Sequence, residues 1–219
     1  MCTLVLARDV VAPGSLLIAT NRDEDPARPS SGPTVLQDAP RIVGGRDLVA
    51  GGTWLAVRGG AEPMVAALLN RRPGPDAVPG RRSRGELPLL VTRAGDARAA
   101  AWEAARSGDF APCTLLVASA RACWRLAIPA DGPPRLDDIA PGWHVLTHTE
   151  LDDPLEPRAH FLLERLRHWH PPTRHEAVGR VRALLAGHGD ATHPAVCLHE
   201  GRMQTVSAAH VWLSDEGVH

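Results

Sequence analysis

Two short apolar stretches near the N-terminus, CTLVLA at residues 2–7 and SLLIAT at residues 15–20, decide how the chain begins to fold. Each has the length of a buried strand, and the Pro-Gly pair between them is typical of a turn. We therefore predict two neighbouring antiparallel strands. Their pairing brings the polar end of the second strand, Asn21–Asp23, close to Cys2 at the start of the first.

The overall composition is that of an ordinary globular protein. The chain has 219 residues and a formal net charge of −1, which argues against a nucleic-acid partner. At this length a single domain over residues 1–219 is expected, and 44% apolar residues suffice for a core. No apolar run approaches the roughly 18 residues of a membrane span, and the N-terminus lacks the basic leader of a secretory signal. We therefore expect a cytoplasmic protein without a membrane span.

Residue usage narrows the chemistry further. All 24 basic residues are arginine, which we interpret as the codon bias of a GC-rich bacterial genome, and the lack of lysine excludes lysine Schiff-base catalysis. Gly and Pro occur 20 times each, so turns are frequent and a sheet-rich fold is favoured. The four cysteines form no CxxC pattern, which indicates reduced thiols rather than a disulfide scaffold.

The rest of the chain groups its strands and helices rather than alternating them. The polar, proline-rich segment at residues 21–33 is predicted to be an ordered loop. Ser83, with Glu86 three residues later, has the pattern of a helix capping box. The order strands, helices, strands, helices, strands predicts an α+β layered fold rather than βαβ units. Further strands are predicted at 53–57, 63–69, 113–119, 123–128, 144–147, 195–199, 203–208 and 210–214, and further helices at 96–106, 156–169 and 174–185.

Cys2 is a candidate nucleophile because of its position. Aminopeptidases remove Met1 before small residues such as cysteine, which leaves a free N-terminal cysteine. Such a residue combines a thiol of pKa about 8.5 with an amine of pKa about 7.7–8.0. The amine, directly or through one water, takes the thiol proton as the thiol attacks a carbonyl group. The alternative is that Cys2 is an ordinary residue at the start of an edge strand.

Polar residues at the ends of two apolar strands are further candidates. Asp23 is expected to hold or orient the N-terminal amine, and Arg22 to bind an anion or to pair with Asp23. Asn70 ends the apolar run at 63–69, where a side-chain amide can donate a hydrogen bond to a developing oxyanion. At each position a solvated turn is the alternative interpretation.

Five segments in sequence order, MCTLVLA, NRDE, VGGRDLVAGGTWLAV, AALLNRR and SRGEL, resemble the NRDE-motif family named for transport and Golgi organisation. The likeness extends from Met1 to about Leu90. That family is similar to the N-terminal nucleophile hydrolases, especially the cysteine branch of bile-salt hydrolases and penicillin V acylases. The resemblance implies a four-layer αββα sandwich. It also implies Cys2 as nucleophile, Asp23 as the contact of the N-terminal amine, and Asn70 as part of the oxyanion hole.

Three positions depart from the pattern of the hydrolase branch. Thr20 stands where an arginine is expected beside the nucleophile, with Arg22 as a candidate substitute. His148 stands where a second asparagine is expected, although it retains a hydrogen-bond donor. A late arginine is expected near the C-terminal strands, where this chain has His193 or no counterpart.

Three further groups of residues could bind a ligand or a metal, and each also has a plain structural interpretation. Trp54 follows a Gly-Gly pair and is a candidate for lining a pocket, with the core as the alternative. His193, Cys197 and His199 have metal-binding side chains, but their spacing matches no standard zinc pattern, so we predict no metal site. The paired glycines lack the patterns of phosphate loops and are expected to permit tight turns and close packing. We therefore expect no cofactor.

Two functions fit these observations. The first is a cysteine amidohydrolase acting on a non-peptide linear amide. Its expected substrate contacts are Asn21, Arg22, Trp54 and His148. The second, which the family resemblance implies, is a non-catalytic haem- or lipid-handling protein on the same scaffold, with haem as a candidate ligand. Both expect a small-molecule partner; the nucleophile, aspartate and asparagine together favour catalysis, whereas the three departures favour binding.

Overall fold

The predicted N-terminal strand pair forms the middle of an antiparallel sheet. The fold is taken from a computed structural model that describes residues 2–73, 80–214 and 217–218. The chain divides into two units: a terminal unit, residues 1–27 with 140–219, and an internal unit, residues 28–139.

The terminal unit contains a sheet of five strands among the described residues. Thr3 pairs with Asn21 and Arg8 pairs with Leu16, as expected for neighbouring antiparallel strands. The second strand continues through the NRDE residues as far as Glu24. In sheet order the strands are β10 (Gly142–Leu146), β1 (Thr3–Arg8), β2 (Leu16–Glu24), β11 (Gln204–Ser214) and β12 (Gly217–Val218).

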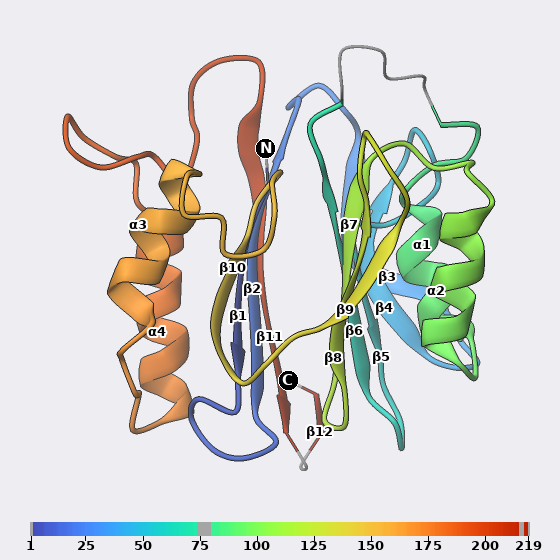
Figure 1. The fold of residues 1–219 in the computed structure, drawn as a ribbon, viewed down its shortest axis with the longest axis horizontal. Coiled ribbons are helices and arrows are strands. Elements are labelled where there is room, and N and C mark those ends of the chain that lie inside the picture. Colours follow the sequence, from blue (N-terminus) through green and yellow to red (C-terminus); the bar gives the residue numbers. More distant parts are fainter. Residues whose placement is uncertain (1, 74–79, 215–216, 219) are drawn as a thin grey trace. The chain divides into compact units, whose positions relative to one another are not determined.

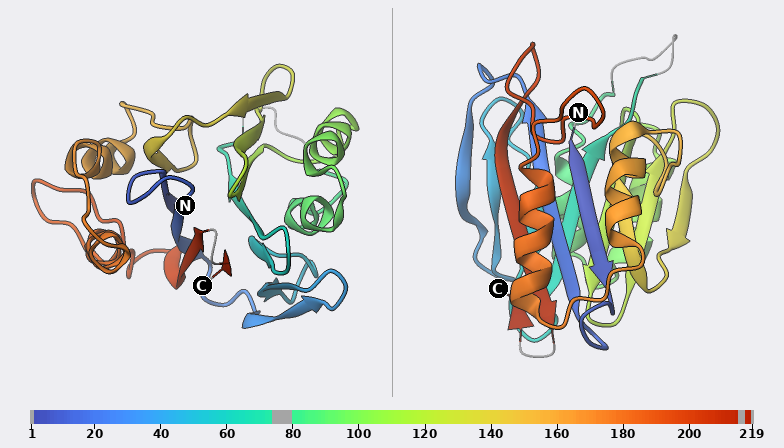
Figure 2. Two further views of the ribbon diagram at one scale, coloured as in Figure 1. Left: turned by 90° about the horizontal axis from the view of Figure 1, so that it is seen from below. Right: turned by 90° about the vertical axis from the view of Figure 1, so that its left-hand side faces the viewer.

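Two helices cover one face of this sheet (Figures 1 and 2). α3 (Pro157–Leu166) begins where the Glu156 carboxylate accepts the N–H of Ala159 at 2.7 Å. α4 (Arg174–Leu185) begins in the same way at the Thr173 hydroxyl. These caps satisfy backbone donors that the first turn of a helix leaves without partners. The core between helices and sheet includes Val5, Ala7, Leu17, Ala19, Trp143, Val145, Leu162, Leu166, Val181 and Leu185.

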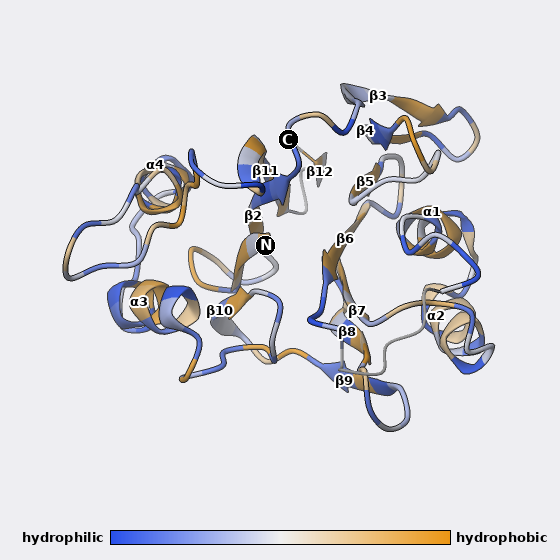
Figure 3. Ribbon diagram, turned by 90° about the horizontal axis from the view of Figure 1, so that it is seen from above, coloured by the Kyte–Doolittle hydropathy of each residue, from blue (hydrophilic) through white to orange (hydrophobic). Residues whose placement is uncertain are grey.

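The internal unit has a sheet of seven antiparallel strands among the described residues, also covered by two helices (Figure 1). In Figure 3 the helices of both units carry hydrophobic and hydrophilic bands, as expected for helices with one buried face. The longest helix in the described part of the chain has 12 residues, well short of a bilayer span. The strands in sheet order are β3 (Ser30–Gln37), β4 (Ile42–Asp47), β5 (Leu55–Arg58), β6 (Met64–Asn70), β7 (Cys113–Ser119), β8 (Cys123–Ile128) and β9 (Arg135–Asp138), and the helices are α1 (Glu86–Arg93) and α2 (Ala97–Arg106).

The glycine pairs of the internal unit allow close packing, as predicted. A side chain at Gly45 would overlap the ring of Trp54. A side chain at Gly52 would overlap the backbone of Gly85, whose carbonyl oxygen accepts the N–H of Thr53 at 2.9 Å. Glycine is therefore required where these backbone segments approach one another.

Several predicted boundaries are wrong, although the predicted helices are confirmed to within a few residues. The segment at residues 21–33 is not a loop, because β2 extends into it and β3 begins within it. The segment at 195–199 is not a strand, whereas 203–208 and 210–214 form one strand, β11. A β-bulge lies within the first of these parts, between Thr205 and Ser207. The strands β3, β4 and β9 were missed because exposed polar residues or glycines obscure their apolar pattern.

An ion pair fixes the turn that follows β10. His144 Nδ1 lies 2.6 Å from Asp152 Oδ2, and His144 Nε2 lies 2.9 Å from the carbonyl oxygen of Ala140. Both partners are acceptors, so both ring nitrogens can donate only when the imidazole is protonated. Burial lowers the pKa of His144, but the hydrogen bond and the charge of Asp152 outweigh this effect and raise the pKa above its ordinary value.

This pair gives the protein a pH-dependent stability. Because the pKa of His144 is raised on folding, its contribution is fully present below the ordinary histidine pKa and is lost as pH rises through the folded value. We expect the free energy of unfolding, measured by urea denaturation between pH 5.5 and 8.5, to fall over that window. His144→Gln should flatten the decline, whereas the exposed His168→Gln should retain it. An unchanged decline in His144→Gln would assign it to another group.

Candidate active site

The register of the terminal sheet decides which side chains surround Cys2. Leu4 of β1 pairs with Thr20 of β2 on one side and with Leu146 of β10 on the other. Extending both registers by two residues puts Arg22 and His148 level with Cys2 on either side. Residues directly opposite one another in a sheet share a face, so Arg22 and Cys2 lie on the same face.

The Cys2 thiol is partly enclosed by its own strand and by β2. Cys2 Sγ lies 3.8 Å from the backbone carbonyl oxygen of Asp23. Burial raises the pKa of the thiol above its ordinary value, and the negative charge of Asp23 acts in the same direction. The positive charge of Arg22 opposes this shift but does not cancel it. The thiol is therefore protonated at neutral pH, and it needs a base before it can act as a nucleophile.

The carboxylate of Asp23 is fully buried and takes part in a network of charged and polar groups. Its Oδ1 accepts a hydrogen bond of 2.6 Å from the hydroxyl of Thr205 in β11. Its Oδ2 lies 3.2 Å from Nη1 of Arg158, in the first turn of α3. Arg158 Nε in turn lies 3.4 Å from Oε1 of Glu156, the residue that caps the same helix. The network thus joins β2, β11 and α3.

Sequence reasoning missed Arg158 and Thr205. They lie 135 and 182 residues from Asp23 along the chain, and neither stands in a recognisable motif. The sequence around Arg158 indicates the start of a helix but not the direction of this side chain. Glu156 at a helix N-cap followed by Pro157 marks the start of α3, but it does not show that the next side chain points inward.

Asn21 is buried and holds the backbone of other segments. Its Nδ2 donates to the carbonyl oxygens of Leu185, at 2.8 Å, and Val196, at 3.1 Å. These bonds join β2 to the end of α4 and to the segment that follows it. Both amide hydrogens are used in this way. Asn21 therefore holds backbone in place, and we assign it no substrate contact.

The other predicted residues of the terminal unit occupy buried positions at the same end of the sheet. Arg22 is 5% exposed, and its Nη2 lies 3.6 Å from Oε2 of Glu24. His148 is 5% exposed and follows the end of β10. Thr20, where an arginine was expected, donates its hydroxyl to the carbonyl oxygen of Thr3 at 3.0 Å. Arg22, two residues further along β2, lies on the same face as Thr20.

Asn70 and Trp54 belong to the internal unit. Asn70 is the last residue of β6, its side chain is exposed, and its backbone pairs with Cys113 of β7. Trp54 is half-buried and packs over Gly45. Burial raises the pKa of Cys113 to about 12, so this thiol is unreactive at neutral pH.

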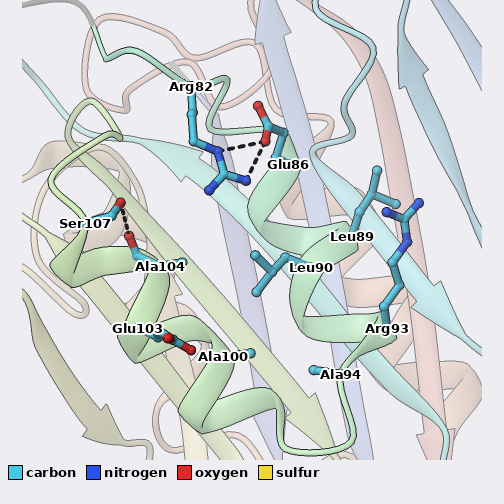
Figure 4. Close-up of a pocket in the computed structure, with 10 residues that line it drawn as sticks. All are labelled: Arg82, Glu86, Leu89, Leu90, Arg93, Ala94, Ala100, Glu103, Ala104 and Ser107. Carbon is cyan, nitrogen blue, oxygen red and sulfur yellow. Dashed lines mark hydrogen bonds and ion pairs between the residues drawn. The ribbon is translucent and has the colours of Figure 1, made fainter.

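A cleft of about 620 Å³ lies along α1 and α2 of the internal unit (Figure 4). Leu89, Leu90 and alanines line it, together with an ion pair of 2.7 Å between Arg82 and Glu86. None of the residues predicted to act on or bind a substrate lines this cleft.

The Asp23 network predicts a large effect of removing its cation. In Arg158→Met the carboxylate of Asp23 stays buried without the guanidinium, so the free energy of unfolding should fall by about 3–5 kcal/mol. Urea denaturation measures this quantity. Arg167→Met, at the exposed C-cap of α3, is the matched control and should change it by less than about 0.5 kcal/mol. Equal effects in the two variants would contradict the network's role.

Solved structures with a similar fold are hydrolases. One is the N-acylethanolamine-hydrolyzing acid amidase ortholog of Caenorhabditis elegans, with a TM-score of 0.63 and 12% identity over 98% of this chain and 93% of that chain. Another is the C2A mutant of conjugated bile acid hydrolase from Clostridium perfringens, with a TM-score of 0.51 and 11% identity over 98% and 89%. Both have the N-terminal nucleophile hydrolase fold, which confirms the predicted α+β sandwich class.

The sequence comparisons identify the family. No curated protein matches the chain. The family described as Transport and Golgi organisation 2, however, matches residues 1–194, which include both strands around Cys2 and the whole internal unit. This agrees with the resemblance carried by the NRDE residues. The chain therefore belongs to the Transport and Golgi organisation 2 family.

Proposed function

We propose that this protein is a cysteine amidohydrolase of the N-terminal nucleophile type, acting on a linear, non-peptide amide. The observation that carries the proposal is the position of Cys2. Its thiol lies against Asp23 at the end of a sheet where the register also brings Arg22 and His148 level with it. Met1 lies outside the described residues, so its removal is part of the proposal.

The raised pKa of the thiol determines the first step. A buried neutral thiol needs a base, and the α-amine of a free Cys2 is covalently attached to the same residue. The amine takes the thiol proton as sulfur attacks the amide carbonyl carbon. The resulting ammonium returns this proton to the leaving amine as the C–N bond breaks, which leaves a thioester on Cys2. Water then hydrolyses the thioester to a carboxylic acid and restores the thiol.

The remaining side chains have supporting roles in this proposal. Asp23 holds the N-terminal amine, and Arg158 and Thr205 fix the carboxylate that does so. The family resemblance assigns Asn70 to the oxyanion hole, and this role is part of the proposal. Arg22 and His148 face the substrate beside the nucleophile. Trp54 is assigned an apolar contact with the acyl chain.

The fold comparisons support the amide class. By name, one neighbour hydrolyses N-acylethanolamines and the other hydrolyses conjugated bile acids. Both names describe hydrolases acting on a small molecule rather than on a protein. The substrates to test first are therefore N-acylethanolamines of several chain lengths and conjugated bile acids.

The test begins with the intact mass of the protein purified from a bacterial cytoplasm. We expect the mass without Met1 and measurable amide turnover. Cys2→Ala should abolish that turnover while the Tm stays within about 2 °C, because Cys2 is only half-buried. The matched control, Cys123→Ala in β8, removes a different thiol and should retain turnover.

Two results would overturn this proposal. If Met1 is retained, the α-amine is part of a peptide bond and cannot act as the base. If Met1 is absent but Cys2→Ala hydrolyses as fast as the wild type, the nucleophile is wrongly assigned. In either case a titration with haem, followed by its Soret band, tests the ligand-handling function instead.

Asn70 can be tested separately. Removing one oxyanion donor typically lowers kcat by about 10²–10³-fold, so Asn70→Ala should do so with little change in KM. Because the side chain is exposed, the Tm should not change, which separates catalysis from stability. Asn70→Gln keeps an amide donor and should recover part of the rate. Unchanged kcat in Asn70→Ala would remove this residue from the mechanism.

A further inference from the structure

Three metal-binding side chains meet in the terminal unit, away from the residues proposed for hydrolysis. The ligand atoms of His188, Cys197 and His199 all lie within 4.8 Å of one another. Cys197 Sγ is 3.7 Å from His199 Nε2, and the rings of His188 and His199 have centroids 4.5 Å apart. The two histidines are exposed and the cysteine is half-buried, so the cluster is open to solvent on one side.

The backbone fixes this arrangement independently of any ion. The carbonyl oxygen of Gly187 accepts the N–H groups of Val196 and Cys197, at 2.9 and 2.8 Å. These bonds hold Cys197 beside His188, which follows Gly187 directly. Cys197 and His199 are two residues apart, and their Sγ and Nε2 atoms approach one another directly. The cluster is therefore assembled by the fold.

The distances suit a tetrahedral transition-metal ion. Zinc–sulfur bonds of about 2.3 Å and zinc–nitrogen bonds of about 2.0–2.1 Å, at a tetrahedral angle, separate the two ligand atoms by about 3.6 Å. The observed sulfur–nitrogen distance of 3.7 Å is close to this value. One thiolate and two imidazoles are donors for zinc and similar ions, not for calcium or magnesium, which prefer oxygen.

We propose that His188, Cys197 and His199 bind one zinc-class divalent ion, with water in the fourth position. This proposal departs from the expectation, drawn from the sequence, that the chain has no metal site. The sequence pattern had suggested His193 as the third residue, but His193 hydrogen-bonds Asp190 at 3.1 Å instead. His188 replaces it, nine residues before Cys197, a spacing that no standard zinc motif contains.

The proposed ion is connected to the Asp23 network through the chain. Leu198, between the two C-terminal ligands, donates its N–H to Oγ1 of Thr205 at 2.9 Å and accepts the N–H of Thr205 at 2.8 Å. The same Thr205 hydroxyl donates to Asp23. An ion that fixes Cys197 and His199 therefore also fixes the residue that holds the Asp23 carboxylate. In this role the metal is structural, and it takes no part in bond breaking.

Metal binding is tested on the full-length chain without an affinity tag. Equilibrium dialysis against zinc chloride should give one equivalent of bound zinc. Cobalt(II) should give a sulfur-to-cobalt charge-transfer band, because a thiolate is among the ligands. Cys197→Ser should abolish that band, and His188→Ala or His199→Ala should weaken binding by about 100-fold or more, beyond the effect of losing an outer-shell partner. Cys2→Ser and the exposed His175→Ala are matched controls that should bind as the wild type does.

Thermal unfolding gives a second measurement that does not depend on activity. Zinc at about 100 times its Kd should raise the Tm of a chain of this size by about 5–10 °C, and it should not raise the Tm of Cys197→Ser. The absence of saturable binding in the wild type would overturn the proposal. A charge-transfer band that survives in Cys197→Ser and disappears in Cys2→Ser would also overturn it, since the ion would then sit on the other thiol.

Discussion

The organisation of the terminal unit depends on the bonds that the buried carboxylate of Asp23 makes with Arg158 and Thr205. An isolated carboxylate in a protein interior costs several kcal/mol in lost hydration, so a strand that carries a buried aspartate near its end requires partners for that group. Arg158 and Thr205 supply them from α3 and β11. These bonds connect β2 to the first turn of α3 and to β11. The polar residues that made 21–33 resemble a loop therefore include those that connect β2 to its neighbours, Asn21 and Asp23.

The side chains on the two faces of β2 make different contacts at this end of the sheet. Asn21 and Asp23 face the helices, where they hold backbone carbonyls, Arg158 and Thr205. Arg22 lies on the other face with Cys2, and its charge lowers the pKa that burial and Asp23 raise. One strand thus holds Asp23 on one face and places Arg22 beside Cys2, the proposed nucleophile, on the other, because successive side chains point to opposite sides. The NRDE residues act through this alternation rather than as a solvated turn.

Much of the fold could be predicted from the sequence, but less of the site. Apolar runs and helix caps are local signals, so the helices and the strands β1, β2 and β6–β8 were predicted. Strands whose exposed faces are polar, such as β3 and β9, leave no such run. In the site, the register argument placed Asp23 beside Cys2 correctly. Arg158 and His188 could not be predicted, because each meets its partner only through tertiary packing.

The state of the Cys2 thiol links these features to function. Burial and the charge of Asp23 both favour the neutral thiol, and neither Arg22 nor any other neighbour reverses this. A thiol in such surroundings stays protonated and does not attack a carbonyl group until a base is placed beside it. In an N-terminal cysteine the base appears when the preceding peptide bond is cleaved, so processing and activation become one event. Under the proposed function, the half-buried position limits access to the thiol before Met1 is removed, and the Asp23 carboxylate, fixed by Arg158 and Thr205, holds the amine that this removal exposes.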